Sequence, residues 1–370
     1  METELIGTLN GILWKQIVMM LVGGILIYLA IKKNYEPTLL LPIGFGAILA
    51  NIPLSSAVGE HGIMTFLYNA GIANEAFPLL IFIAIGAMID FSPLLKNPVL
   101  LLFGAAAQFG IFFTVMAAAL MGFDLKEAAS IGIIGAADGP TSIYVANKFA
   151  PHLLGPISVA AYSYMALVPI IQPPIIRLLT SRKERLIRMH IRPKSVSKTA
   201  LIVFPVVVTI YAGIIAPASV SLIGFLMFGN LIRECGVLNK LSLSAQNELA
   251  SLVTLVLGIA IATTMTADKF LTQSTLFIIA LGLVAFMFDT AGGVLFAKFL
   301  NLFLKEKINP MIGAAGISAF PMSARVIHKM GLKEDGTNFL LMYAVSANVG
   351  GQIASVIAGG LILSLVPLFR

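Results

Sequence analysis

The sequence predicts an all-α membrane protein that crosses the bilayer many times, and three observations carry this prediction. Hydrophobic residues make up 58% of the 370 positions and charged residues only 11%, whereas soluble domains carry about 25% charged residues. Apolar runs of about 17 to 25 residues, the length of a spanning helix, recur from end to end. Segments of about ten residues with alternating polarity, which indicate a membrane β-barrel, are not found.

The expected helical segments follow from the apolar runs, taken in order. In the first half they lie at residues 11–31, 38–54, 76–90, 98–122, 128–147 and 153–180, and in the second half at residues 199–216, 217–233, 249–265, 274–304, 308–328 and 338–367. Several are short or interrupted by Gly and Pro. We therefore expect about ten or eleven crossings, together with re-entrant or interrupted helices.

The first apolar segment is expected to be a retained span rather than a signal peptide. Two Glu residues precede the first Lys in "METELIGTLNGILWK", and no small-residue cleavage site follows. A secretory signal would carry a basic start. The expected location is therefore a bacterial or archaeal cytoplasmic membrane.

A basic stretch divides the chain almost in half. Arg177–Lys198 holds eight Lys or Arg residues and one Glu, which predicts a cytoplasmic position, as does the earlier basic loop Ile31–Glu36. We therefore predict a first membrane repeat at residues 1–180, a cytoplasmic linker at 181–198 and a second membrane repeat at 199–370. The net charge of +7 is attributed to such loops and not to a nucleic-acid surface.

Two similar motifs indicate an internal repeat. "GAADGPTSIYVANKF" (135–149) and "GAAGISAFPMSARVIHKM" (313–330) share Gly-Ala-Ala and the same spacing of Pro, Ser and Lys. Matching broken segments in two halves of a membrane protein are the usual sequence sign of a transporter-like binding site. Five crossings in the first half, from outside to the cytoplasmic linker, would make the repeats inverted.

Several kinds of chemistry are excluded by what the sequence lacks. Its single cysteine, Cys235, cannot form an internal disulfide or a thiolate metal site. The four histidines show no metal-binding spacing, and no phosphate-binding Gly-rich loop is present. If this chain carries out chemistry, we therefore expect the energy or the cofactor to come from another subunit.

Asp138 is the first candidate functional residue. A carboxylate at the centre of a spanning helix costs about 2.5–3.5 kcal/mol, and Gly139 and Pro140 both disfavour a continuous helix. A broken helix would let the carboxylate and free carbonyl groups face a sodium ion, with Thr141 and Ser142 adding hydroxyl oxygens. The alternative is a helix cap, since Asp followed by Gly-Pro also starts ordinary helices.

Arg325 is the second candidate. Its guanidinium could bind a carboxylate in a bidentate manner. The alternative is an arginine that extends to the membrane interface beside His328 and Lys329.

Other polar residues in apolar segments also have two interpretations. Asn348 suits an oxygen ligand of sodium, or else an interhelical hydrogen bond. Tyr162 and Tyr164 could relay a proton, or anchor the chain at the interface. Asp90 and Asp289 each end an apolar run and are either interfacial or intramembrane.

The runs "GAADGPTSIYVANKFAPHLLGPISVAAYSYMALVPIIQPPIIRLLT", "GGVLFAKFLNLFLKEKINPMIGAAGISAFPMSARVIHKMG" and "SANVGG" strongly resemble the membrane β subunit of the sodium-pumping biotin-dependent decarboxylases. The resemblance implies a chain that accepts carboxybiotin from the cytoplasmic side, decarboxylates it with consumption of a proton, and exports Na+. It also implies partners: a carboxyltransferase α subunit, a biotin carrier subunit and a small membrane γ/δ subunit, with membrane lipid around a homo-oligomer and no nucleic acid.

The resemblance assigns roles to individual residues. It implies catalytic roles for Asp138, Tyr164 and Arg325, sodium ligation by Asp138, Asn348, Ser318 and Asn309, and carboxybiotin binding by Arg325, Gly313 and Asn309. The expected cofactors are Na+ and carboxybiotin carried on a partner subunit, with no covalently bound cofactor in this chain. The acid or acyl-CoA that starts the cycle is not indicated.

Combined with the residue chemistry, this gives one mechanistic hypothesis. Asp138 binds sodium when ionised and becomes easier to protonate when sodium leaves, so that it could supply the proton through Tyr164 while Arg325 holds the carboxylate. The alternative function is a sodium-coupled secondary transporter of an organic anion, with Arg325 binding the solute and Asp138 the ion.

Overall fold

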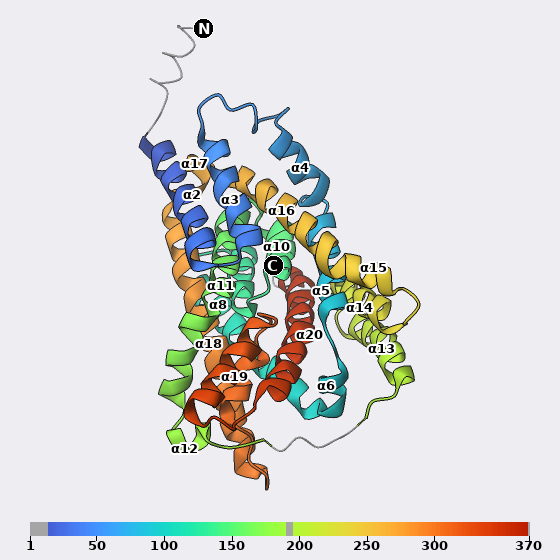
Figure 1. Cartoon of the computed structure of the whole chain (residues 1–370). Coiled ribbons are helices and arrows are strands. Elements are labelled where there is room, and N and C mark those ends of the chain that lie inside the picture. Colours follow the sequence, from blue (N-terminus) through green and yellow to red (C-terminus); the bar gives the residue numbers. More distant parts are fainter. Residues whose placement is uncertain (1–13, 190–194, 369–370) are drawn as a thin grey trace.

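The computed structural model describes residues 14–189 and 195–368, and all regular structure in these ranges is helical (Figure 1). Seven of the described helices are long and apolar enough to cross a membrane, or up to eight if the bent pair Ile63–Gly71 and Ala76–Met88 forms one span. The predicted all-α membrane fold is confirmed. Ten or eleven crossings stay a prediction, since shorter and broken helices make up the rest.

The predicted apolar segments correspond to helices whose bounds agree within a few residues. In the first half the helices are α2 (Trp14–Lys33), α3 (Pro37–Asn51), α4 (Ile63–Gly71), α5 (Ala76–Met88), α6 (Ser92–Lys96), α7 (Leu101–Ala107), α8 (Phe109–Leu120), α9 (Leu125–Gly132), α10 (Gly139–Phe149), α11 (Leu154–Leu179) and α12 (Arg182–Arg185). In the second half they are α13 (Lys198–Ile215), α14 (Val220–Glu234), α15 (Asn239–Ser244), α16 (Ala250–Ile261), α17 (Ala267–Phe270), α18 (Gln273–Phe303), α19 (Met322–Glu334) and α20 (Leu341–Leu365).

Two predicted segments are broken, as their Gly and Pro content indicated. Segment 128–147 is divided into α9, a short 3₁₀ helix η2 (Ile133–Ala136) and α10, and segment 308–328 into a 3₁₀ helix η7 (Pro310–Gly316) and α19. Both breaks lie inside the bundle, where α18, α11 and α20 surround them. Buried irregular backbone of this kind is tolerated in a membrane protein only where other protein groups satisfy it.

The helices of the two halves pack in exchanged pairs. In the first set α5 packs on α14, α11 on α18, and η2 on α18; in the second α16 packs on α3, α20 on α7, and η7 on α7. If the two halves are equivalent, the pairs correspond in the order given, so that the contact of α5 with α14 corresponds to that of α16 with α3. The two inverted repeats remain a prediction, and this exchange of partners is the pattern they would produce.

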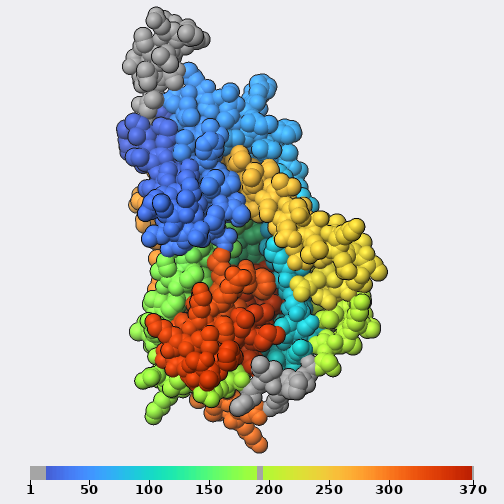
Figure 2. All heavy atoms as spheres, in the orientation of Figure 1, coloured from blue at the N-terminus to red at the C-terminus, as the bar shows by residue number. Residues whose placement is uncertain are grey.

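The outer helices present apolar side chains to the surroundings. On α13 the exposed residues include Val203, Ile210 and Ile214, and α2 exposes Leu21 and Ile25 in the same way. Figure 2 shows how the N-terminal helices and the C-terminal helices cover different parts of one face. Such apolar outer faces are suited to lipid.

The described part of the basic linker is bound to the second half. α12 begins with a capping box between Ser181 and Glu184. Arg185 forms an ion pair with Glu334 of α19 at 2.7 Å, and Lys298 of α18 lies 3.1 Å from Glu184. Residues 190–194 of the predicted linker lie outside the described residues. The linker therefore marks one end of the molecule, shared by α12 and α19, whereas α4 and α17 lie at the opposite end (Figure 1).

Substituting Glu184 by Gln is expected to weaken this attachment in a pH-dependent way. Burial raises the pKa of Glu184, but hydrogen bonds from the Ser181 N–H and hydroxyl and the contact with Lys298 lower it, and the net pKa lies below the ordinary 4.5. A depressed folded-state pKa means that the stabilisation is present above about pH 4.5 and is lost as the pH falls through the lower value.

The measurement is the melting midpoint in detergent at two pH values. At pH 7 the Glu184→Gln protein should be less stable by less than about 1 kcal/mol, and near about pH 3 the difference should vanish. Glu60→Gln, at an exposed position, serves as the control. An unchanged difference at low pH would contradict the assignment.

Candidate functional site

The first break places a carboxylate at the start of a helix. Ala137, directly after η2, has φ 54°, a left-handed conformation that costs a non-glycine residue about 1–2 kcal/mol. Asp138 follows as the N-cap of α10, with Pro140 in the first turn. The capping interpretation of the sequence is thus correct in geometry, and it does not exclude a functional role. The local strain shows that this turn is held by its surroundings.

Both oxygens of the Asp138 carboxylate accept hydrogen bonds. Oδ1 accepts from the backbone N–H of Thr141 at 3.3 Å, and Oδ2 from the hydroxyl of Thr141 at 2.7 Å. The hydroxyl of Ser355 on α20 donates to Oδ2 at 3.1 Å. The residue is 3% exposed. These donors are all neutral, so a negative charge on Asp138 would lack a cationic partner among these contacts.

The second break contacts the first directly. After η7 the chain is extended at Ile317, and the backbone N–H of Ser318 donates to the carbonyl oxygen of Ala136 at 3.0 Å. The two similar motifs, 178 residues apart when counted from Gly135 to Gly313, therefore meet at their interruptions. These motifs are similar in sequence, and the structure brings them together in space.

One face of α20 joins the two breaks. The Asn348 amide donates to the Ile317 carbonyl oxygen at 2.6 Å, and the Gln352 amide donates to the carbonyl oxygen of Ser318. The Ser318 hydroxyl donates to the Gly351 carbonyl oxygen at 3.0 Å. Asn348, Gln352 and Ser355 are spaced i, i+4 and i+7, so they lie on one side of the helix. This side holds the second break and contacts Asp138.

Three buried oxygen atoms near these breaks have no hydrogen-bond partner among the described residues. They are Oδ1 of Asn348, Oε1 of Gln352 and the hydroxyl of Tyr162. An unsatisfied buried oxygen is costly and usually indicates a missing ligand or water. Amide, hydroxyl and carboxylate oxygens are the hard ligands that suit a cation such as sodium. The oxygen atoms around Asp138 therefore fit a bound monovalent cation.

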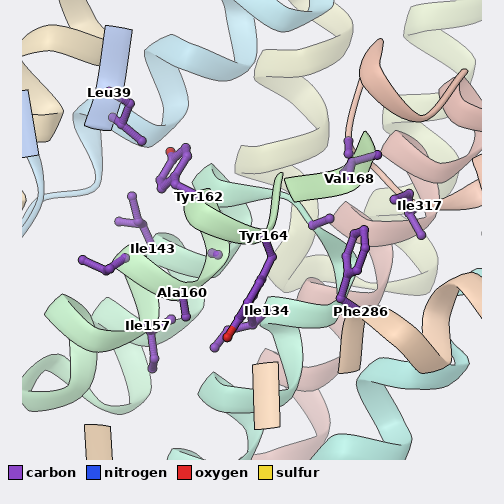
Figure 3. Packing of buried hydrophobic residues seen from close by; sticks show 14 of the residues in the cluster. Leu39, Ile134, Ile143, Ile157, Ala160, Tyr162, Tyr164, Val168, Phe286 and Ile317 are labelled. Carbon is purple, nitrogen blue, oxygen red and sulfur yellow. The ribbon is translucent and has the colours of Figure 1, made fainter. Parts of the chain in front are cut away.

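The two tyrosines of α11 lie on opposite sides of the helix (Figure 3). The ring of Tyr162 covers Gly139, where an added Cβ would lie 2.2 Å from its Cζ atom. The hydroxyl of Tyr164 instead donates to the backbone carbonyl oxygen of Ile279 on α18. Of the two, Tyr162 is the one that contacts the residue beside Asp138. Both tyrosines were candidates from the sequence, whereas the family resemblance implied the functional role for Tyr164.

Two other predicted site residues, Asn309 and Gly313, have contacts of a structural kind. The side chain of Asn309 caps η7 by accepting from Met311 N–H at 3.1 Å, and donates to the Arg185 and Ile187 carbonyl oxygens at 2.8 Å each. Gly313 packs against Gly293 of α18, where a Cβ added to Gly313 would lie 2.0 Å from the Gly293 carbonyl oxygen. Asn309 thus binds the linker, and Gly313 permits close contact between η7 and α18.

Arg325 lies in a basic cavity at the linker end of the molecule. The cavity has a volume of about 350 Å³ between α11 and α19, and Arg325 itself is exposed. Its charged lining residues are Arg177, Arg325, Lys329 and Lys333. Four cations around one opening attract an anion. The contacts of Arg325 are therefore separate from those of Asp138.

Some site residues were not identified from the sequence. Gln352 and Ser355 follow Asn348 in "NVGGQIAS", and their helical spacing could have revealed them. Gln172 of α11 donates to the Ala314 carbonyl oxygen at 2.8 Å and accepts from the Ser323 hydroxyl at 2.9 Å. These two bonds anchor the second break. The one sequence signal for Gln172 is its polar side chain inside the apolar run "PIIQPP".

The fold and this site define a class: polytopic helical membrane proteins with a polar, ion-compatible site between two interrupted helices. The family model of the Na+-transporting oxaloacetate decarboxylase beta subunit matches residues 15–366. The chain belongs to this family, as its sequence motifs indicated, and is thus a β subunit of the sodium-translocating decarboxylase class.

Named relatives cover almost the whole chain. The glutaconyl-CoA decarboxylase subunit beta of Acidaminococcus fermentans is 53% identical, over 95% of this chain and 94% of the relative. The methylmalonyl-CoA decarboxylase subunit beta of Propionigenium modestum is 50% identical, over 96% of each. The oxaloacetate decarboxylase beta chain 2 of Salmonella typhi is 47% identical, over 95% of each. Relatives named for three different substrates thus align with almost the whole chain.

Proposed function

We propose that this chain decarboxylates carboxybiotin, brought by a partner biotin carrier, and couples the reaction to Na+ export across the cytoplasmic membrane. The observation that carries the proposal is the buried Asp138 carboxylate, which lies where two helix breaks meet and close to oxygen atoms without partners. The family membership gives the reaction its class. The proposed partners are the carboxyltransferase α subunit, the biotin carrier and a small γ/δ subunit, in a homo-oligomeric complex.

The proposed sodium ligands are the oxygens of Asp138, Asn348 and Ser318. The Asn348 amide nitrogen donates to the Ile317 carbonyl oxygen, while its Oδ1 atom has no partner among the described residues. Ser318 lies on the second break beside Ala136. Gln352 is a further ligand in this proposal, because its Oε1 atom is also free. The bond pattern of Asn309 favours a role in holding the linker rather than in binding the ion.

The reaction consumes one proton, and Asp138 can supply it. When the bond between the biotin nitrogen and the carboxyl carbon breaks, carbon dioxide leaves and the nitrogen takes up a proton. Asp138 cannot hold sodium and a proton at once, because the cation favours the ionised carboxylate. Sodium exit and proton entry at this residue then alternate. Tyr162, whose ring contacts Gly139, is better placed than Tyr164 to relay the proton.

Access to the site is proposed from the linker end. The basic cavity that contains Arg325 lies between α11 and α19, at the same end as α12 (Figure 1). With the linker on the cytoplasmic side, Arg325 would hold the carboxylate of carboxybiotin as it arrives. A second cavity of about 820 Å³, lined by Thr263, Thr266 and Asp268, opens elsewhere and offers oxygen groups for departing sodium.

The decisive experiment is reconstitution of the purified complex in proteoliposomes. Added carboxybiotin should be decarboxylated only with sodium present, and sodium should accumulate in vesicles whose linker end faces outward. The alternative function, an organic-anion transporter, predicts sodium-dependent solute uptake without any biotinyl protein. Solute uptake without decarboxylation would overturn the proposal in favour of that alternative.

Arg325→Gln is expected to raise the KM for carboxybiotin about 10- to 100-fold with a smaller change in kcat. A charge-assisted hydrogen bond contributes about 1.5–3 kcal/mol, and an interaction lost from ground and transition states alike appears in KM. Arg325→Lys keeps the charge and should lose less. Steady-state kinetics on the reconstituted complex measure both. An unchanged KM in the Gln variant would place the carboxylate elsewhere.

A further inference from the structure

A second buried carboxylate lies in the bundle and takes no part in the mechanism above. Asp289 is 0% exposed and lies near the middle of α18, the longest helix described. Its Oδ1 atom accepts one hydrogen bond, from the backbone N–H of Ile111 at 3.2 Å. Its Oδ2 atom is buried and has no partner among the described residues. A carboxyl group in this position is expensive in a membrane and is a candidate for function.

The N-terminus of α8 faces this carboxylate. α7 ends at Ala107 and α8 begins at Phe109, and the Ile111 N–H in the first turn of α8 is shared between two acceptors, the Gln108 carbonyl oxygen at 3.1 Å and Oδ1 of Asp289 at 3.2 Å. Gly110 lies so close to the carboxylate that an added Cβ would be 2.4 Å from Oδ1. The positive end of a helix favours the ionised form of an acid. Asp289 can therefore hold a negative charge without a cationic side chain.

The free oxygen of Asp289 lies against the first break. A Cβ added to Gly135 would lie 2.6 Å from Oδ2 and 2.9 Å from the Ala285 Cβ. Gly135 belongs to η2, which ends two residues before Asp138. Gly110 lies close to Oδ1 and Gly135 close to Oδ2, so there is no space here for a metal ion with its ligands. A proton on Oδ2 needs no such space. The ligand that fits this site is therefore a proton.

The titratable groups around Asp289 are few. α7, α8, η2 and η7, which all pack on α18, contain no titratable side chain. α11 contributes Tyr164, which contacts Gly282, about two turns before Asp289 on α18. α11 also carries Tyr162 and Arg177, and α9 carries Lys126 and Glu127 in its first turn. On α18 itself the next charged residue is Lys298, which bonds to the linker end. The charge of Asp289 thus depends mainly on whether its own carboxyl group is protonated, and less on neighbouring charged side chains.

We propose that Asp289 is a second proton-binding carboxyl group of the pump, and that its charge state positions the first break through Gly135. One proton from water binds Oδ2 and is later returned to water, and no bond between heavy atoms changes. The neutral acid lets η2 approach, whereas the ionised carboxylate, drawn to the α8 amides, changes the contact with Gly135. Asp289 is a positioning residue for Asp138, since it touches the break and not the substrate.

Infrared difference spectroscopy tests the protonation directly, and it does not require the complex to pump. The proposal predicts a buried carboxylic-acid C=O band that changes between high and low pH in the Asp138→Asn protein and is absent when Asp289→Asn is added. Thr290→Val is the matched control, because among the described residues this neighbouring buried hydroxyl donates to the Phe286 carbonyl oxygen alone. With this substitution the band should remain. If adding Asp289→Asn leaves the difference spectrum unchanged, Asp289 does not titrate and the proposal is wrong.

The transport readout rests on the proposed function. Asn at position 289 keeps an oxygen for the Ile111 N–H but cannot ionise, so one limb of the pH profile of sodium transport should shift by about one pH unit or disappear. Thr290→Val should leave the profile in place. A profile with Asp289→Asn that matches the wild type would show a purely structural group. If the wild-type complex does not transport sodium but the infrared band still depends on pH and on Asp289, the proposed function is contradicted and the protonation of Asp289 is not.

Discussion

Asp138→Asn is expected to abolish sodium-coupled decarboxylation, by at least about 100-fold in rate, while the protein still folds. An Asn side-chain oxygen in the place of Oδ1 can still accept from the Thr141 N–H. Its amide group can then donate to the hydroxyl oxygens of Thr141 and Ser355, which contact Oδ2 in the structure. The cap on α10 is thus largely kept. What is lost is the negative charge that binds sodium and the acidic proton that the reaction consumes.

Two measurements separate these losses from misfolding. Carboxybiotin decarboxylation and sodium uptake are followed together in proteoliposomes, and the melting midpoint in detergent reports the fold. Ser355→Ala removes one donor without removing the carboxylate and should retain most of the activity. If the Asp138→Asn protein still exports sodium during decarboxylation, the shared proton and sodium site is excluded.

A pair of asparagines provides a matched comparison for the ligand set. Asn348 and Asn230 are both buried, each donates through its amide to a backbone carbonyl oxygen, and each has an unpartnered Oδ1. Only Asn348 contacts the second break. This likeness means that a free amide oxygen alone does not identify an ion site, and that the position of Asn348 beside the second break is the informative part.

The fold was predictable because burial in a membrane is recorded in hydropathy. Segment 274–304 was expected and α18 occupies Gln273–Phe303, since a long apolar run has few alternatives to a helix in lipid. Segment 308–328 was expected to be interrupted, but the extent of η7 was not. Its Gly and Ala residues fit several backbone conformations, and contacts from other helices decide among them.

The site was less predictable because it depends on helix faces and on contacts far apart in the sequence. Tyr162 and Tyr164 are two residues apart, and two helical positions differ by about 200°, so only one can face Asp138. Sequence pattern does not say which. Asp289 could be placed at the interface or inside from its run alone, and it is the packing of α8 and η2 on α18 that makes it fully buried.

The second large effect is expected at the contact between η7 and α18. A Cβ added to Gly313 would lie 2.0 Å from the Gly293 carbonyl oxygen, and one added to Gly293 would lie 2.0 Å from the Gly313 carbonyl oxygen. Backbone cannot yield as a flexible side chain can, so Gly313→Ala and Gly293→Ala should each destabilise the protein by about 1–3 kcal/mol or more. Melting midpoints in detergent measure the loss.

The two substitutions also separate packing from substrate binding. Gly24→Ala is the control, because Gly24 lies in α2 with nothing within 4 Å of an added Cβ, and helix propensity makes it neutral or favourable. If Gly313 acts through packing, Gly293→Ala must reproduce its effect on stability and activity. If Gly313 binds carboxybiotin, as the family resemblance implied, only Gly313→Ala will raise the KM for carboxybiotin. Because the two glycines share one contact, equal effects would assign Gly313 to the support of the second break.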